Sequence, residues 1–139
     1  MNMLQHPAAV THAATLRTDP RLVSLEQFFG DRECPAVVVA EVFVEAADTY
    51  GLDWRLLPSI SFVESTGGKA ARNNNLFGWD GGRAEFPSLS AAIHTVGFSL
   101  ANSRIYRDKD LDELLETYNP GAEYGRKVKS VMQRISPSE

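Results

Sequence analysis

Cysteine, long apolar runs and blocks of basic residues are scarce or missing in this sequence, and each absence excludes a class of protein. The single cysteine, Cys34, excludes an intrachain disulfide framework and a cysteine-based zinc site. No apolar run approaches the roughly 20 residues that span a bilayer. The net charge is −4 and no long Lys/Arg block is present, which disfavours nucleic acid as a partner.

The chain does have the composition of one folded domain. Its 139 residues are 43% hydrophobic and 23% charged, a balance typical of a globular protein. Residues 1–23 show no sustained period and are predicted to form a flexible tail, followed by a domain over 24–136 and a short tail over 137–139. No basic segment precedes an apolar one near the start, so no signal peptide is predicted. We expect a monomer without a cofactor or a metal ion.

Apolar residues at helical spacing predict an all-α fold. The predicted helices span about 35–50, 53–65, 88–102, 110–118 and 121–135. The stretch 67–87 is different, because it holds five of the ten glycines and a run of three asparagines. Its composition predicts a long loop or a short β-hairpin around 80–82.

Glu64 is the first candidate for chemistry. It lies at the carboxyl end of an apolar helix, after Phe62 and Val63 and before a glycine-rich turn. Partial burial and the negative end of the helix dipole both disfavour the ionised carboxylate, as a general acid requires. The plain alternative is a solvated glutamate that ends a helix.

The residues after Glu64 favour a sugar-binding groove. The run Asn73-Asn74-Asn75 leads into Leu76-Phe77-Gly78-Trp79. Amide side chains can bind sugar hydroxyl and acetamido groups, while aromatic faces cover the apolar C–H surfaces of the ring. A turn held by asparagine side chains over an aromatic cluster would have the same composition.

Three segments together resemble the bacterial glucosaminidase family, the endo-β-N-acetylglucosaminidase-like group of the lysozyme and lytic transglycosylase superfamily. They are Leu56 to Ser65, Asn74 to Gly78, and Tyr118-Asn119. The resemblance covers about residues 25–136. It implies a lysozyme-like helical domain in which the long loop or hairpin forms one wall of the cleft.

The resemblance also implies residue roles. Glu64 matches the general acid, and Tyr118 a tyrosine near it, expected to donate a hydrogen bond to Glu64 or to lie within its reach. The expected substrate-binding residues are Ser65, Asn74, Asn75, Phe77, Gly78, Trp79 and Asn119. The implied substrate is the glycan strand of peptidoglycan, cut between N-acetylglucosamine and N-acetylmuramic acid, which implies an extracytoplasmic location.

The second catalytic group is left open by the sequence. A two-carboxylate glycosidase needs a base or nucleophile beside its acid, and Asp80 and Glu85 are the candidates in the loop. One carboxylate would suffice if the acetamido group of the substrate attacks, or if an intramolecular attack leaves an anhydro sugar, as in lytic transglycosylases.

Two other functions compete with this one. A wall-binding module without activity would need the same asparagines and aromatic residues. A cell-wall peptidase could use Cys34, placed before Pro35 at a predicted helix start, together with His94. Simple packing explains both side chains equally well.

Overall fold

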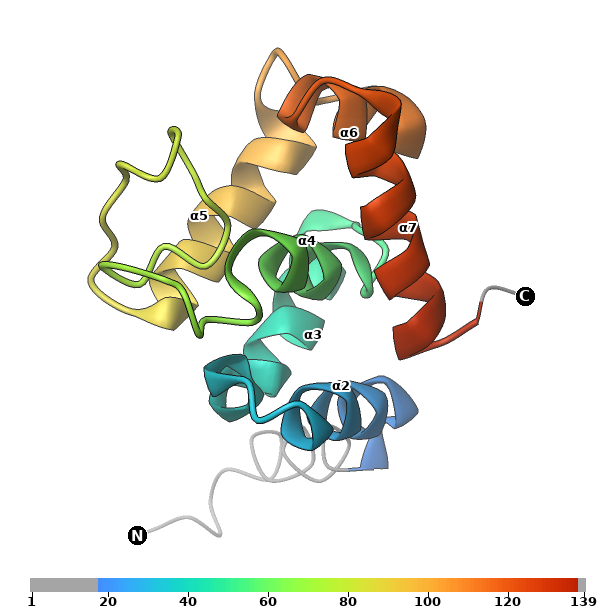
Figure 1. Ribbon diagram of the computed structural model, residues 1–139. Helices are drawn as coiled ribbons and strands as arrows, with labels where there is room; N and C mark the ends of the chain where they lie inside the picture. Colours follow the sequence, from blue (N-terminus) through green and yellow to red (C-terminus); the bar gives the residue numbers. More distant parts are fainter. Residues whose placement is uncertain (1–17, 138–139) are drawn as a thin grey trace, which may run out of the picture.

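A computed structural model of the chain describes residues 18–137, and every regular element within them is a helix (Figure 1). In chain order the elements are α2 (Pro20–Asp31), the 3-10 helix η2 (Pro35–Val39), α3 (Ala40–Tyr50), α4 (Leu56–Ser65), α5 (Leu89–Asn102), α6 (Leu111–Tyr118) and α7 (Ala122–Ile135). The predicted all-α class is confirmed at this level. Most of the two predicted tails, residues 1–17 and 138–139, lies outside the described residues.

Helix α2 begins inside the segment 1–23 that the sequence predicts to be a tail, so that boundary is wrong. The Asp19 carboxylate accepts a hydrogen bond from the Arg21 N–H over 2.9 Å and caps the helix. Pro20 occupies the first turn, where its missing N–H costs nothing. Leu22 is buried against the core, which ties this start of the helix to the domain.

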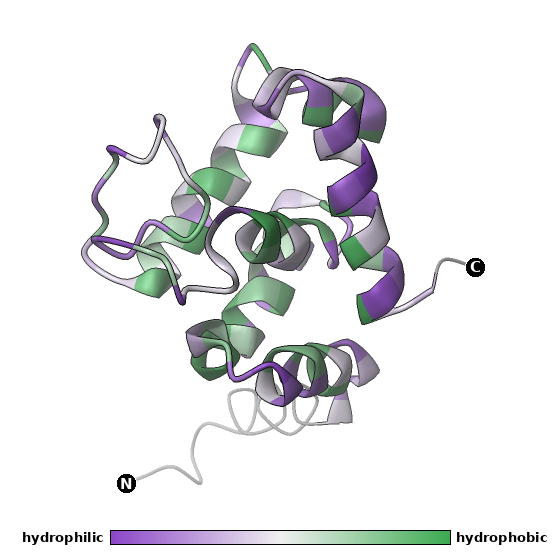
Figure 2. Cartoon of the chain, viewed as in Figure 1, coloured by the Kyte–Doolittle hydropathy of each residue, from purple (hydrophilic) through white to green (hydrophobic). Residues whose placement is uncertain are grey.

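Helix α4 lies in the middle of the fold, with the other helices around it (Figure 1). It packs mainly against α7 and α3. Its residues 56–61 are all buried, and Figure 2 shows it as one of the most apolar segments. Apart from three buried serines the helix is apolar, as a buried helix must be, and Glu64 is its one charged residue.

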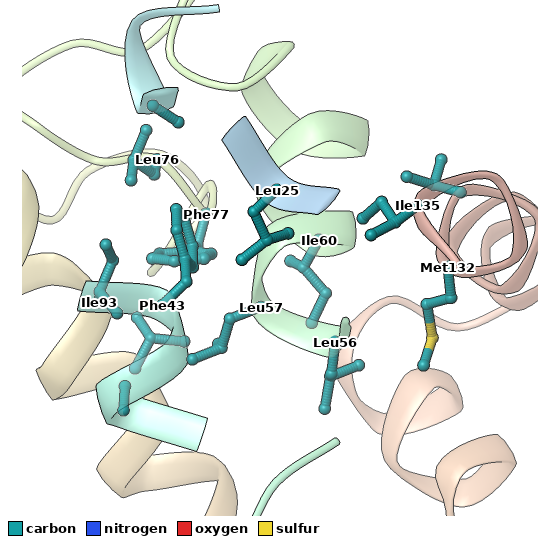
Figure 3. Packing of buried hydrophobic residues seen from close by; sticks show 14 of the residues in the cluster. Leu25, Phe43, Leu56, Leu57, Ile60, Leu76, Phe77, Ile93, Met132 and Ile135 are labelled. Carbon is teal, nitrogen blue, oxygen red and sulfur yellow. The ribbon is translucent and has the colours of Figure 1, made fainter. Parts of the chain in front are cut away.

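The core joins helices from every part of the chain (Figure 3). The labelled side chains are Leu25, Phe43, Leu56, Leu57, Ile60, Leu76, Phe77, Ile93, Met132 and Ile135. Leu76 and Phe77 belong to the loop after α4 rather than to a helix, and both are fully buried. Burial of side chains of this size stabilises the fold by about 2–3 kcal/mol each, so the loop is anchored to the core.

The segment 66–88 is a loop without strands, and the β-hairpin considered at its tip is not formed. Asp80, Gly81 and Gly82 all have positive φ, at 55°, 61° and 85°. The Gly82 N–H donates to the Gly78 carbonyl over 3.1 Å, which closes a tight turn rather than a strand ladder. The long-loop alternative is therefore the correct one.

Two predicted helix starts are confirmed by their caps. The Ser88 hydroxyl accepts a hydrogen bond from the Ala91 N–H at the start of α5. Asp110 and Glu113 form a reciprocal capping box at the start of α6. Short polar side chains before an apolar period are reliable start signals because they satisfy backbone groups that a helix leaves free.

The predicted helices over 35–50 and 53–65 begin differently in the structure. The first is split into η2 and α3 at Val39, whose φ of −118° interrupts the α-helix. Three consecutive valines disfavour a regular α-helix because their side chains lose rotamer freedom. The second begins at Leu56, since the Asp53 side chain accepts from the Arg55 N–H before the helix starts.

None of the helices among residues 18–137 combines the length and the apolarity that crossing a membrane requires.

Candidate active site

Glu64 lies in the last turn of α4 and is half-buried. The helix ends because Thr66 adopts the left-handed conformation, with φ of 54°. The Tyr124 hydroxyl, from the first turn of α7, donates a hydrogen bond to Glu64 Oε2 over 2.9 Å. Burial and the adjacent Glu64 carboxylate raise the pKa of Tyr124, which keeps this hydroxyl protonated as a donor.

Gly78 lies against the same carboxylate. A Cβ atom on Gly78 would lie 2.6 Å from Glu64 Oε1, closer than real Cβ contacts allow. Its φ of 59° is also one that side chains disfavour. Glycine is therefore required here for two reasons, and the Glu64 carboxylate lies between the Tyr124 hydroxyl and the Gly78 backbone.

Asn75 holds the turn that carries Gly78. Its side-chain oxygen accepts from the Trp79 N–H over 2.9 Å, and its amide donates to the Trp79 carbonyl over 3.0 Å. The side chain is almost fully buried, with 5% exposed. Asn75 thus fixes the backbone beside Glu64, as in the alternative of a turn held by asparagine side chains, and it also lines the cleft.

Ser65 ties the end of α4 to the same turn. Its hydroxyl donates to the Leu76 carbonyl over 2.8 Å and accepts from the Gly68 N–H over 3.1 Å. The residue is 4% exposed, so it lies at the base of the site with its hydrogen bonds already used. Its position fits a positioning role better than the predicted contact with substrate.

An open cleft of about 520 Å³ lies beside Glu64. Its lining residues are Glu64, Ser65, Ala70, Arg72, Asn75, Gly78, Gly81, Gly82, Tyr118 and Asn119. One wall is the loop after α4, and the other is the turn at the end of α6. The family resemblance implies the loop wall, whereas Arg72 is not among the residues expected to line the cleft.

A second hollow, of about 550 Å³, adjoins the first. The two share Gly78, Gly81 and Tyr118, so they form one continuous groove. The second hollow adds Trp79 and Tyr106, whose ring centroids lie 6.3 Å apart. Because Tyr106 is only 8% exposed, the aromatic surface of this hollow comes mainly from the half-buried Trp79.

Tyr118 lines the same cleft as Glu64, but it does not donate the hydrogen bond to Glu64 that was one of its two expected arrangements. Its hydroxyl donates to the Phe77 carbonyl over 2.6 Å, and its ring stacks on that of Tyr124 with centroids 6.0 Å apart. Tyr124 is the residue that donates to Glu64. The helical spacing of Tyr124 and Val128 predicts an inward position for both side chains, but spacing does not identify the partner of a hydroxyl group.

Of the other predicted binding residues, some line the groove and others support it from within the protein. Trp79 is half-buried and Asn119 is exposed, and each lines part of the groove. Phe77 is fully buried in the core, so it supports the groove from beneath instead of lining it. The Asn74 amide donates to the Phe86 carbonyl over 2.9 Å and closes the base of the loop.

Neither candidate for a second carboxylate lines the hollow that contains Glu64. Asp80 is exposed, lines the second hollow and pairs with Arg83 over 2.9 Å. Glu85 is exposed and lines neither hollow. Among the described residues, Glu64 is therefore the one carboxylate that lines its cleft.

Cys34 and His94 do not have the features of a catalytic pair. Cys34 is 1% exposed, and this burial raises the pKa of its thiol, the opposite of the effect expected from a helix start. His94 Nδ1 forms a hydrogen bond with the Tyr50 hydroxyl over 2.9 Å. Packing explains both residues.

Within residues 18–137 there is no group of three or more His, Cys, Asp or Glu side chains that could hold a metal ion. No family model, curated protein or solved structure matches the chain. The geometry of the groove is therefore the basis for assigning a function.

Proposed function

We propose that this protein is a glycosidase that degrades peptidoglycan, with Glu64 as general acid and the bond between N-acetylglucosamine and N-acetylmuramic acid as its target. The observation that carries the proposal is the placement of Glu64. Its carboxylate is half-buried, contacts the Tyr124 hydroxyl and the Gly78 backbone, and lines an open cleft. A proton donor for a glycosidic oxygen needs such a fixed position beside a groove.

The shape of the groove supports a polymeric substrate. Two adjoining hollows share the residues between them, so a chain of sugars can occupy both at once. The first hollow is rich in polar and backbone groups, and the second carries the Trp79 and Tyr106 rings. Sugars present both kinds of surface, with hydroxyl and acetamido groups at the ring edge and C–H groups on its faces.

The chemistry that this cleft supports uses one protein carboxylate. Glu64 donates its proton to the glycosidic oxygen as the bond from that oxygen to C1 breaks. A group of the substrate then attacks C1, either the acetamido oxygen or the 6-hydroxyl of the same sugar. In the first case water opens the ring formed and returns a proton to Glu64, and in the second the hydroxyl proton returns and an anhydro sugar is released.

We also propose a fold family and a cellular location for this protein. A central buried helix that ends in the acid, with a loop as one cleft wall and a helical turn as the other, supports assignment to the lysozyme-like glucosaminidases. Because its substrate lies in the cell wall, the proposed enzyme acts outside the cytoplasm.

Digestion of purified peptidoglycan by the protein and by Glu64→Gln tests this function. We expect the wild type to release glycan fragments and Glu64→Gln to release at least about 100-fold less, because the amide cannot donate the proton. Glu85→Gln is the matched control, since it makes the same change on an exposed side chain that lines neither hollow.

The released fragments identify the reaction. Mass spectrometry of their ends distinguishes hydrolysis, which leaves a reducing sugar, from intramolecular attack, which leaves an anhydro sugar. Equal release by wild type and Glu64→Gln would show that Glu64 is not the acid. Binding of the wild type to peptidoglycan without any release would identify a wall-binding module instead.

A further inference from the structure

Glu64 and Arg72 are the two charged side chains that line the cleft, and their surroundings differ. Glu64 is half-buried and contacts Tyr124. Arg72 is exposed, and its guanidinium has no ion pair or hydrogen bond with any residue in the range 18–137. The cleft therefore holds one cation whose hydrogen-bonding groups are free for a bound molecule.

Several other arginine side chains have a partner within the protein, unlike that of Arg72. Those that pair with a carboxylate of this chain are Arg21, Arg55, Arg83 and Arg126. Arg32 lies over the ring of Phe28 at 4.0 Å from its centroid. Arg72 has neither kind of neighbour, although it lines a groove rather than a plain surface.

The backbone fixes where Arg72 stands. Its carbonyl accepts a hydrogen bond from the Asn75 N–H over 3.0 Å. The residues between them, Asn73 and Asn74, both have the left-handed conformation, with φ of 54° and 62°. This tight turn fixes the backbone of Arg72 at the cleft that Glu64 also lines.

We propose that Arg72 binds a carboxylate carried by the muramyl residue, so that the cleft selects muramyl-containing strands over uncharged polymers of N-acetylglucosamine. This inference rests on the proposed function. A planar guanidinium with paired N–H donors matches a carboxylate better than any other group of the strand. The two sugars of peptidoglycan differ in the lactyl ether of the muramyl residue, which N-acetylglucosamine lacks.

The carboxylate has two possible sources with the same chemistry. Where the stem peptide has been removed, the lactyl group itself ends in a free carboxylate. Where the stem is present, the lactyl carboxyl is in an amide bond and the acids of the peptide supply the charge. In both cases the negative charge projects from the muramyl side of the bond to be cut.

Binding of small muramyl compounds tests the role of Arg72 without any need for cleavage. N-acetylmuramic acid, muramyl dipeptide and N-acetylglucosamine are titrated into the wild type while chemical shifts of its backbone amides are recorded by NMR. We expect at least one of the two acids to bind about three- to tenfold more tightly than N-acetylglucosamine, because the ion pair forms at an exposed site. Preference for N-acetylmuramic acid identifies the lactyl group, and preference for muramyl dipeptide identifies the stem.

Three variants assign that preference to the guanidinium. Arg72→Gln should lose it and keep its affinity for N-acetylglucosamine, whereas Arg72→Lys should keep part of it, since charge remains without the paired donors. Arg104→Gln, which removes the same charge from an exposed residue outside the cleft, should keep it fully. Thermal unfolding of each variant checks that the fold is intact.

The outcomes separate this inference from the proposed function. Equal affinity of the wild type for all three compounds, or no detectable binding of either acid, overturns the role of Arg72. So does an equal loss of affinity for all three in Arg72→Gln. Glu64-dependent digestion together with equal affinities would leave the glycosidase in place, while a lost preference in Arg72→Gln without digestion would leave a muramyl-binding cleft without the enzyme.

Discussion

The two walls of the cleft are built in different ways. The loop wall, residues 66–88, has no regular element and depends on single contacts, such as the paired hydrogen bonds of Asn75 and the close approach of Gly78 to Glu64. The helical wall, at the ends of α6 and α7, depends on packed helices and on the stacked rings of Tyr118 and Tyr124.

This difference predicts which parts of the site tolerate amino-acid substitutions. Loss of one hydrogen bond in a helix leaves many equivalent bonds in place, whereas each contact of the loop wall has no substitute. Stacked rings also keep their apolar contact when one hydroxyl is removed. We therefore expect substitutions in the loop wall to cost more than matched substitutions in the helical wall.

The largest effect is expected for Gly78→Ala. The new Cβ would collide with Glu64 Oε1, and since the carboxylate is the flexible partner, the acid moves while the fold survives. A displacement of about 1 Å lowers catalytic rates about 100-fold. The rate of peptidoglycan digestion measures this effect.

Gly51→Ala separates this collision from backbone strain. Gly51 lies outside the groove and has a positive φ of 69°, but a Cβ atom there would meet nothing within 4 Å. Both variants should lose roughly 1–2 kcal/mol of unfolding free energy from the left-handed conformation. Only Gly78→Ala should lose most of its activity, and similar activity in the two variants would refute the contact with Glu64.

The next largest effect is expected for Asn75→Ala. It leaves the Trp79 N–H without its partner, which should lower the free energy of unfolding by about 2 kcal/mol, whereas the Trp79 carbonyl still accepts from the N–H groups of Gly82 and Ala84. Asn102→Ala is the control, because the Asn102 amide makes one exposed bond to the Phe98 carbonyl. Urea unfolding compares them, and an equal loss in both would contradict the idea that the loop depends on single contacts.

Smaller effects are expected for the two tyrosines of the helical wall. Tyr124→Phe removes the donor to Glu64 and should lower kcat about tenfold with little change in KM. Tyr118→Phe removes the donor to the Phe77 carbonyl and should instead cost about 1 kcal/mol of unfolding free energy. If Tyr118→Phe lowered kcat more than Tyr124→Phe, our assignment of the hydroxyl groups would be reversed.

The smallest effect is a fall in the free energy of unfolding at alkaline pH, caused by the same two tyrosines. Burial raises the pKa of both above the value of 10.0 for a free tyrosine. The unfolded chain then releases these protons first, so the stability present below pH 10 falls as the pH rises above it. Each phenylalanine variant should lose less stability than the wild type between about pH 9 and about pH 11, as followed by thermal unfolding.

Sequence patterns predict helices where α3 to α7 lie, and the place of Glu64, because these depend on local signals, whereas α2 is not among the predicted helices. Ser88 and Asp110 cap their helices as expected, and Glu64 lies at the carboxyl end of an apolar helix in both the sequence and the structure. The hairpin is wrong because Gly82 also has a positive φ and its N–H bonds back to the carbonyls of Gly78 and Trp79, so no strand ladder follows the turn.

The partners of polar side chains could not be predicted in the same way. The Asn75 amide could bind a sugar or the backbone, and the amino-acid composition of the loop does not distinguish the two; in the structure it binds the Trp79 carbonyl. Tyr118 and Tyr124 are close in sequence and stack in space, so which hydroxyl donates to Glu64 depends on how α7 packs against α4. The hydrogen-bond partners of these side chains are therefore set by tertiary contacts, which local sequence does not reveal.

The contact between Gly78 and Glu64 also constrains how this protein can evolve. Any other residue at position 78 would displace the acid, so no single neutral substitution leads away from glycine there. The tip of the loop can vary more freely in length and sequence, because a Cβ atom added at Gly81 or Gly82 would not contact Glu64. Lineages that diverge from this one should therefore vary at the tip of the loop and keep positions 64 and 78 as a pair.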